Sequence, residues 1–182
     1  TPIYNQKNCG IAKTRNIALS NCNNDIITFL DADDIFYSKK LELEYKMLNN
    51  SNCDIIYSNF NYIDSGSNKI GQFASFNDNP ATGKILKNTL MRTYNISSGN
   101  NMIYEMFYKN CLNEVGLYDQ KLKLWEEWDL RIRMSEKFRY NYCSKINSGY
   151  RQLKDGLNNS NHSLHFSEQI KVINKNKKII KK

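Results

Sequence analysis

Three carboxylates end an apolar run of β-type residues near the start of the chain. The run 26–30 leads directly into Asp31, Asp33 and Asp34, with Ala32 between the first two acids. Residues two apart on an extended backbone point to the same side, so Asp31 and Asp33 would face one ligand, and the small Ala32 leaves room for its approach. Two oxygen ligands on one side suit Mg²⁺ or Mn²⁺ carrying a diphosphate.

The same acids also have a purely structural interpretation. Asp33 or Asp34 could turn the chain and cap a helix that begins near Ser38, with no metal involved. A short Asp-x-Asp pattern does not decide between the two interpretations, because such motifs recur by chance.

A second pair of acids, Glu126 and Glu127, lies between Trp125 and Trp128 at the predicted start of a helix. The helix dipole favours acids in a first turn, so capping alone could explain these charges. Aromatic walls beside acids can also bind the faces of sugars or raise the pKa of a carboxyl group. The residues alone leave both interpretations open.

Together with an upstream segment, the two acidic motifs resemble the family 2 glycosyltransferases of the GT-A fold. The resemblance covers roughly residues 5 to 155 and implies an α/β domain with a mainly parallel sheet flanked by helices. The matching stretches occur in the family's usual order: Asn8-Cys9-Gly10-Ile11-Ala12-Lys13-Thr14-Arg15-Asn16-Ile17-Ala18-Leu19, Phe29-Leu30-Asp31-Ala32-Asp33-Asp34 and Glu126-Glu127-Trp128-Asp129-Leu130.

The resemblance implies roles for individual residues. Asp33, helped by Asp31, would hold the Mn²⁺ or Mg²⁺ that neutralises the leaving diphosphate. Glu127 would take the proton from the attacking hydroxyl, although the family has Asp at this position and the longer Glu changes the reach. Glu126 beside it is the alternative base. The remaining assignments are Arg15, Asp31 and Arg151 on the nucleotide donor, with a surface role as the alternative for both arginines, and Asp34, Trp125 and Trp128 on the sugar or acceptor.

Hydrophobic periodicity predicts the elements that carry these motifs. The run 26–30 is too apolar for a half-solvated strand, which favours a central parallel strand covered on both faces. Leu41, Tyr45 and Leu48 recur at i, i+4 and i+7 and predict a helix with that stripe as its apolar face. Further helices are predicted at 10–21, 85–91, 108–115 and from 124, and further strands at 54–62, 69–73, 100–104 and from 141.

The helix that follows Trp125 has its own periodic pattern. Leu130, Met134 and Phe138 form the predicted buried stripe at four-residue steps. Asp129 and Arg133 form an i, i+4 pair, worth only ~0.3–0.5 kcal/mol if it is exposed.

The chain opens on Thr1–Gln6 without the strand and helix expected before the first motif of an α/β domain. In the resembled family, an earlier strand–helix–strand section holds the nucleotide base. The expectation is therefore a partial, N-terminally truncated GT-A domain over 1–160, followed by a basic helix or tail over 161–182. Such a chain alone is expected to bind nucleotide diphosphates weakly and to transfer little sugar.

Composition limits the remaining classes of function. The 182 residues are 40% hydrophobic, enough for one domain with a core. The net charge is +8, but residues 171–182 hold six lysines, so the rest carries only +2 and argues against a nucleic-acid surface. Five widely spaced cysteines without a C-x-x-C pair favour reduced thiols and a cytoplasmic location. The Lys-rich tail is either a peripheral contact with the inner face of a membrane or a solvated, frayed end.

These observations predict a metal-dependent, inverting glycosyltransferase that moves a sugar from a nucleotide-diphosphate donor to an acceptor hydroxyl in cell-surface glycan or polysaccharide synthesis. The alternative is a non-catalytic or truncated remnant of the fold that serves as a binding module. A metal-dependent phosphoesterase would need further metal ligands, which the sequence does not place.

Overall fold

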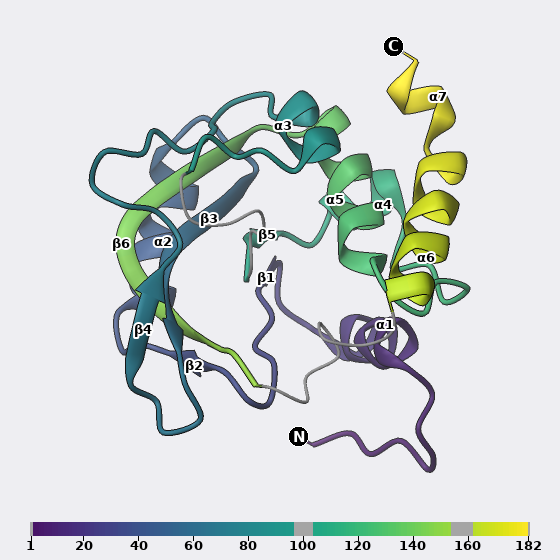
Figure 1. The fold of residues 1–182 in the computed structure, drawn as a ribbon, viewed down its shortest axis with the longest axis horizontal. Helices are drawn as coiled ribbons and strands as arrows, with labels where there is room; N and C mark the ends of the chain where they lie inside the picture. Colours follow the sequence, from purple (N-terminus) through teal and green to yellow (C-terminus); the bar gives the residue numbers. More distant parts are fainter. Residues whose placement is uncertain (1, 97–103, 154–161, 182) are drawn as a thin grey trace.

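The computed structural model describes residues 2–96, 104–153 and 162–181, which form a curved, six-stranded sheet with helices packed on it (Figure 1). The strands pair in the order β1–β5–β3–β6–β2, and β4 pairs with β3. Their bounds are β1 Ile26–Ile27, β2 Ile35–Phe36, β3 Ile55–Ile63, β4 Lys69–Gln72, β5 Met106–Tyr108 and β6 Tyr140–Arg151.

The two long strands, β3 and β6, run parallel through the middle of the sheet. Ile55, Ile56 and Tyr57 of β3 are all fully buried. Because successive strand residues face opposite sides, this burial means that both faces of the sheet are covered here. The other strand pairs in the described ranges are antiparallel. The predicted α/β class is confirmed, with a sheet that is mixed in direction.

Helices cover the two faces of the sheet. Leu48 of α2 packs against Ile56 on one face, and Leu130 and Met134 of α5 join the cluster around Tyr57 on the other. The helices predicted at 10–21, 85–91, 108–115 and from 124 are all present. The bounds are α1 Ile11–Asn21, α2 Lys40–Asn50, α3 Leu86–Met91, α4 Cys111–Val115, α5 Glu126–Lys137, α6 His162–Lys175 and α7 Lys177–Ile180.

The C-terminal helix α6 is docked on α5, beside which it runs in Figure 1. Val172 is fully buried, and the Asn176 amide donates to Asp129 Oδ1 at 2.9 Å. Asp129 Oδ2 accepts from Arg133 Nη2 at 2.7 Å and from Lys175 Nζ at 2.9 Å. The expectation of a frayed tail is therefore wrong for 162–181, and the expected weak surface pair of Asp129 is the centre of a buried network.

The predicted central strand at 26–30 is wrong in length and position. Only Ile26 and Ile27 are in a strand, at one end of the sheet and antiparallel to β5. The chain then leaves the sheet, and Phe29 packs edge-on against Tyr118 with ring centroids 5.8 Å apart. Apolar residue type alone did not separate a central strand from a short strand followed by a segment that packs on loops and helices.

Helix α2 forms where the spacing predicted it, but with a different face inward. Leu41 and Tyr45 are about half exposed, at 54% and 50%, whereas Lys40, Glu44 and Leu48 are buried. Lys40 Nζ lies 2.5 Å from Glu44 Oε1 and donates to the Tyr104 carbonyl at 3.1 Å. A charged pair can occupy an inward face when the two charges offset each other and find hydrogen-bond partners, so apolar periodicity predicted the helix correctly and its orientation wrongly.

The strands expected at 54–62, 69–73 and from 141 are confirmed as β3, β4 and β6. The strand expected at 100–104 falls mainly outside the described residues, and the strand of this segment is β5. Gly116 follows α4 with a φ of 80°, which glycine adopts without strain and which ends the helix as predicted. No helix in the described ranges is long and apolar enough to cross a membrane.

Candidate functional site

Arg15 joins the two acidic motifs that the sequence singles out. It lies on α1 and is buried, and its guanidinium reaches acids from two distant parts of the chain. Arg15 Nη2 lies 2.9 Å from Asp31 Oδ1, and Nη1 lies 3.2 Å from Glu126 Oε1 and 2.6 Å from Glu127 Oε1. Acids that lie 16 positions and more than a hundred positions from Arg15 in the sequence thus converge on its side chain.

Aromatic rings and an amide hold this guanidinium in place. The rings of Phe29 and Tyr118 each lie 5.6 Å from the Arg15 guanidinium carbon, within the range of a cation–π contact. The next residue on α1, Asn16, donates to the Tyr118 carbonyl at 2.9 Å and accepts from the Tyr118 amide at 3.0 Å. The Arg-Asn pair of α1 therefore fixes both the cation and one of the rings around it.

Burial and the neighbouring charges both shift the pKa values of this cluster. Burial first, and then the neighbouring Glu127, raise the pKa of the Glu126 carboxyl to about 7, against the opposing pull of Arg15. For Arg15, burial disfavours the charged form, but Glu127, Tyr118 and Asp31 outweigh it and raise the pKa above its ordinary value. Arg15 is a permanent cation here, and Glu126 exchanges its proton near neutral pH.

Asp31, Asp33 and Asp34 lie on a turn rather than on the extended backbone predicted for them. The Asp34 amide donates to the Asp31 carbonyl at 3.1 Å, which closes the turn. Asp33 is exposed at its tip, whereas Asp34 is half-buried and accepts from the Arg151 amide at 2.6 Å. Burial raises the pKa of Asp34 to about 6, with Asp33 and Asp31 adding to the shift and the Arg151 amide opposing it. The three acids still lie close enough to interact.

Arg151, predicted to contact phosphate, ties backbone segments together. Its Nε donates to the Asp33 carbonyl at 2.6 Å, and Nη1 donates to the carbonyls of Asp64 at 2.5 Å and Ser65 at 3.1 Å. Nη2 donates to Ser67 Oγ at 2.9 Å. These contacts do not support the phosphate role, because the donors of this guanidinium are engaged in holding the acidic turn against the 64–67 turn.

The two tryptophans differ in how far they are available to a ligand. Trp128 is buried, and its Nε1 donates to the Thr89 carbonyl at 2.9 Å. This position does not support the predicted stacking of Trp128 on a sugar. Trp125 is partly exposed, and its ring lies against those of Trp128 and His165 with the Arg92 guanidinium 4.4 Å from its centroid.

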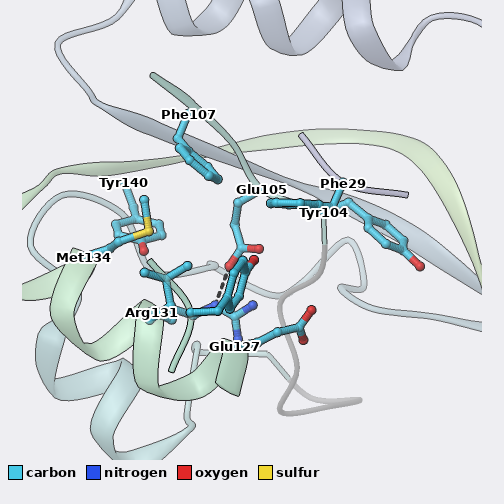
Figure 2. A pocket seen from close by; sticks show the side chains of 10 residues that line it. Phe29, Tyr104, Glu105, Phe107, Glu127, Arg131, Met134 and Tyr140 are labelled. Atoms are coloured by element: carbon cyan, nitrogen blue, oxygen red, sulfur yellow. Dashed lines mark hydrogen bonds and ion pairs between the residues drawn. The ribbon is translucent and has the colours of Figure 1, made fainter. Parts of the chain in front are cut away.

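A small pocket, partly open to solvent, adjoins the cluster (Figure 2). Glu127 reaches into it from α5, and Glu105 and Arg131 are ion-paired within it. Although burial opposes ionisation of Glu105, the Arg131 guanidinium lowers the pKa of this carboxyl below its usual range. Most of the remaining lining is aromatic or apolar: Phe29, Tyr104, Phe107, Tyr118, Leu130, Met134 and Tyr140.

Comparison with known families identifies the chain. The model of the family described as "Glycosyltransferase like family 2" matches residues 2–175. This chain belongs to that family.

Two relatives give the extent of the similarity. A glycosyltransferase of Methanocaldococcus jannaschii, MJ1057, is 30% identical over 132 residues, which are 72% of this chain and 43% of that protein. Escherichia coli WfgD, named as a UDP-Glc:alpha-D-GlcNAc-diphosphoundecaprenol beta-1,3-glucosyltransferase, is 34% identical over 87 residues, 48% of this chain and 32% of WfgD. This chain spans less than half the length of either relative.

Solved structures show the same fold. S. aureus TarS 1–349 in complex with UDP-GlcNAc superposes with a TM-score of 0.60 at 14% identity, covering 91% of this chain and 47% of that one. A second structure of S. aureus TarS 1–349 superposes with a TM-score of 0.59 at 15% identity, covering 80% of this chain and 42% of that one. The GT-A fold expected from the motifs is therefore confirmed.

Within this family 2 chain, the acidic turn has a ligand set that fits a divalent cation only in part. The Asp33 carboxylate is exposed, and Asp31 keeps much of its side chain open beside Arg15. The described residues contain no group of three or more His, Cys, Asp or Glu arranged to hold a metal. Two carboxylates suit a cation that takes its other ligands from a diphosphate and water, as Mg²⁺ commonly does.

Sequence reasoning missed Tyr118, Glu105 and Arg131. Tyr118 lies in the segment Gly116-Leu117-Tyr118-Asp119 that follows α4, but nothing in the sequence paired it with Arg15. Glu105 is a single charge within an otherwise apolar segment, a pattern that could have suggested a buried ion pair, whereas Arg131 lies among the other charges of α5 and gave no such signal. The contact itself joins residues 26 apart and is visible only in the fold.

Proposed function

We propose that this protein is a glycosyltransferase that moves a sugar from a nucleotide-diphosphate donor to an acceptor hydroxyl, in the synthesis of a cell-surface glycan or polysaccharide. The observation that carries the proposal is the convergence of Asp31, Glu126 and Glu127 on Arg15 beside an aromatic-lined pocket. The Asp-x-Asp turn and the Glu-Glu pair thereby form one site, with a donor side and an acceptor side.

Glu127 is the residue that we assign as the general base. About half of its side chain is exposed and it lines the pocket, whereas the neighbouring Glu126 is buried. A base must reach the proton that it removes, and only Glu127 of the two opens to the space that an acceptor would occupy. Its carboxylate would take the proton of the acceptor hydroxyl as that oxygen attacks the anomeric carbon. A single displacement of this kind inverts the anomeric configuration.

Arg15 would position the base. Its Nη1 lies within ion-pair distance of both Glu126 and Glu127, and its Nη2 holds Asp31 of the donor-side turn. This geometry fixes the base relative to the turn that carries Asp33, so the distance between acceptor and donor would be set by one rigid side chain. The motif predicts that Arg15 contacts the nucleotide. We propose instead that Arg15 lies between the donor side and the acceptor side and holds the acids of both.

Asp33, helped by Asp31, would hold a Mn²⁺ or Mg²⁺ ion, and Asp34 would fix the turn. The ion, when bound, would offset the negative charge of the leaving diphosphate. Asp33 suits this task because it is exposed, and no hydrogen bond from the described residues occupies its carboxylate.

The metal assignment is tested by Asp33→Asn, which removes a ligand charge and keeps the volume. Calorimetry should detect UDP binding that requires Mn²⁺ in the wild type, and the variant should lose at least ~10-fold of that affinity, the cost of about 1.4 kcal/mol. The matched control is Asp25→Asn, an exposed acid just before β1. Equal Mn²⁺-dependent binding by wild type and Asp33→Asn would contradict the metal site.

The transfer activity is tested by a screen of nucleotide sugars with and without Mn²⁺ or Mg²⁺. UDP-glucose and UDP-GlcNAc come first, because WfgD is named for the one and TarS 1–349 forms a complex with the other. Anomer-resolved product analysis by NMR should show inversion. Retention of configuration would exclude Glu127 as a base in a single displacement.

A further inference from the structure

The outer face of α6 and α7 carries a row of exposed apolar side chains. Phe166, Ile170 and Ile173 are exposed at 67%, 42% and 43%, and Ile180 lies one further repeat along at 40%. The i, i+4 and i+7 spacing of Phe166, Ile170 and Ile173 places them on one side of α6, and Ile180 follows on α7. Val172 and the network of Asp129 dock the opposite side on α5, so this row faces away from the core. Helices α6 and α7 themselves lie at the edge of the molecule in Figure 1.

The same segment is strongly basic. From Gln169 to Lys181 the sequence contains five lysines and no acid. Lys171 pairs with Glu168, and Lys175 pairs with Asp119 and Asp129. Lys177, Lys178 and Lys181 are exposed beside the apolar row. An exposed aromatic and aliphatic row flanked by lysines is the composition of a helix that lies on an anionic bilayer surface.

From this arrangement we infer that the outer face of α6 and α7, defined here by Phe166, Ile170, Ile173, Ile180 and the three lysines, docks the protein on an anionic membrane. Charge complementarity selects the bilayer over a second copy of this chain, because two such faces would bring their lysines together with no acid to offset them. Phosphate contacts with a nucleic acid would leave the isoleucines exposed to water.

Docking would also place the candidate site near the membrane. His165 of α6 lies edge-on to Trp125, with ring centroids 5.6 Å apart, and Trp125 directly precedes Glu126 and Glu127. The start of the docking helix thus borders the acceptor side of the proposed site. The inference itself rests on exposure and charge, and it does not depend on the glycosyltransferase activity.

Sedimentation with vesicles tests the inference. The protein should bind vesicles of equal parts phosphatidylcholine and phosphatidylglycerol, bind pure phosphatidylcholine much more weakly, and dissociate as salt is raised. Lys177→Gln, Lys178→Gln and Lys181→Gln together should weaken binding roughly 100-fold, since each lysine near an anionic surface contributes about fivefold. Phe166→Ser, Ile170→Ser and Ile173→Ser together should have a similar effect, about 100-fold, through lost apolar burial.

Matched controls separate the face from bulk properties. Lys13→Gln, Lys87→Gln and Lys145→Gln remove the same charge from exposed positions on other parts of the surface. Leu41→Ser, Ile70→Ser and Phe76→Ser remove exposed apolar side chains elsewhere. Both control sets should keep vesicle binding within about threefold of the wild type. Since all of these side chains are exposed, the thermal unfolding midpoint should be similar in every variant.

Three results would overturn the inference. The first is that the wild type does not bind anionic vesicles. The second is that the control set of three lysine substitutions weakens vesicle binding as much as the three lysine substitutions on the outer face of α6 and α7 do. The third is lipid-free self-association, seen by sedimentation velocity, that Phe166→Ser abolishes, because the face would then join two copies of the chain.

Discussion

Helix α5 carries acids that serve two different purposes within its first turn. Glu126 and Glu127 meet α1, and both lie within ion-pair distance of the same nitrogen, Nη1 of Arg15. Asp129 meets α6, and four hydrogen bonds converge on it: two from Arg133, one from Lys175 and one from Asn176. Glu126 and Glu127 thus share one donor nitrogen, whereas Asp129 alone accepts four hydrogen bonds.

The number of hydrogen-bond donors for each acid distinguishes the reactive pair, Glu126 and Glu127, from the structural acid Asp129. A buried carboxylate with several donors is fully compensated, and a change of partner would cost it free energy. Two carboxylates that share one donor repel each other, and a ligand or a proton can relieve that repulsion. Burial first, and then this repulsion from Glu127, raise the pKa of Glu126.

The largest effect on the free energy of unfolding is expected at Asp129, whose charge is fully compensated by its hydrogen-bond donors. Asp129→Asn should lower the free energy of unfolding by about 3 kcal/mol or more, because it leaves Arg133 and Lys175 without their buried counter-charge. Urea denaturation measures this change. The control Asp119→Asn removes a more exposed partner of the same Lys175 and should cost less than about 1 kcal/mol. Equal, small losses in both variants would mean that Asp129 is no more important than a surface acid.

The role of Asp129 also shows where sequence reasoning stops. The i, i+4 spacing to Arg133 was visible, but Lys175 and Asn176 lie 46 and 47 residues further on. Local patterns predicted helices and strands well because periodicity is a local property. They did not predict which face of α2 is buried or that Ile26–Ile27 is at one end of the sheet, because packing between distant segments decides both.

The candidate site was predictable for a different reason. The Asp-x-Asp turn, the Arg-Asn pair and the Glu-Glu pair are each readable as short motifs, and the fold brings their side chains together around Arg15. What the motifs could not supply is the partner of each group. The engagement of Arg151 with backbone carbonyls and the burial of Trp128 both depend on residues tens of positions away.

A smaller free-energy change, seen as a loss of turnover rather than of stability, is expected where Glu126 and Glu127 share Arg15. Glu127→Gln should lower turnover by at least ~10²-fold, about 2.7 kcal/mol, while donor affinity and stability change little, since Gln keeps the shape but cannot take a proton. Steady-state kinetics and donor calorimetry measure the two parts. Glu126→Gln is the matched variant, and a larger loss of turnover there would place the base one residue earlier than we propose.

The smallest effect is the contribution of Glu126 to the pH dependence of the free energy of unfolding. Folding raises the pKa of this carboxyl from its ordinary 4.5 to about 7, so between these values the folded state binds the proton more tightly than the unfolded state. The stabilisation that this group contributes is fully present below pH 4.5 and is lost as the pH rises toward 7. Glu126→Gln removes this titration. Over this pH range, the free energy of unfolding of the variant should therefore fall by on the order of 2 kcal/mol less than that of the wild type.

The comparison between wild type and variant isolates this contribution, because Asp34 titrates in the same range with a pKa of about 6 and is present in both proteins. Urea denaturation at a series of pH values gives the two slopes. Parallel slopes would mean that Glu126 does not hold its proton more tightly in the folded protein, and that Arg15 compensates it as fully as Arg133 and Lys175 compensate Asp129. The two clusters of α5 would then be alike in kind, and the exposure of Glu127 would be the property that distinguishes the site.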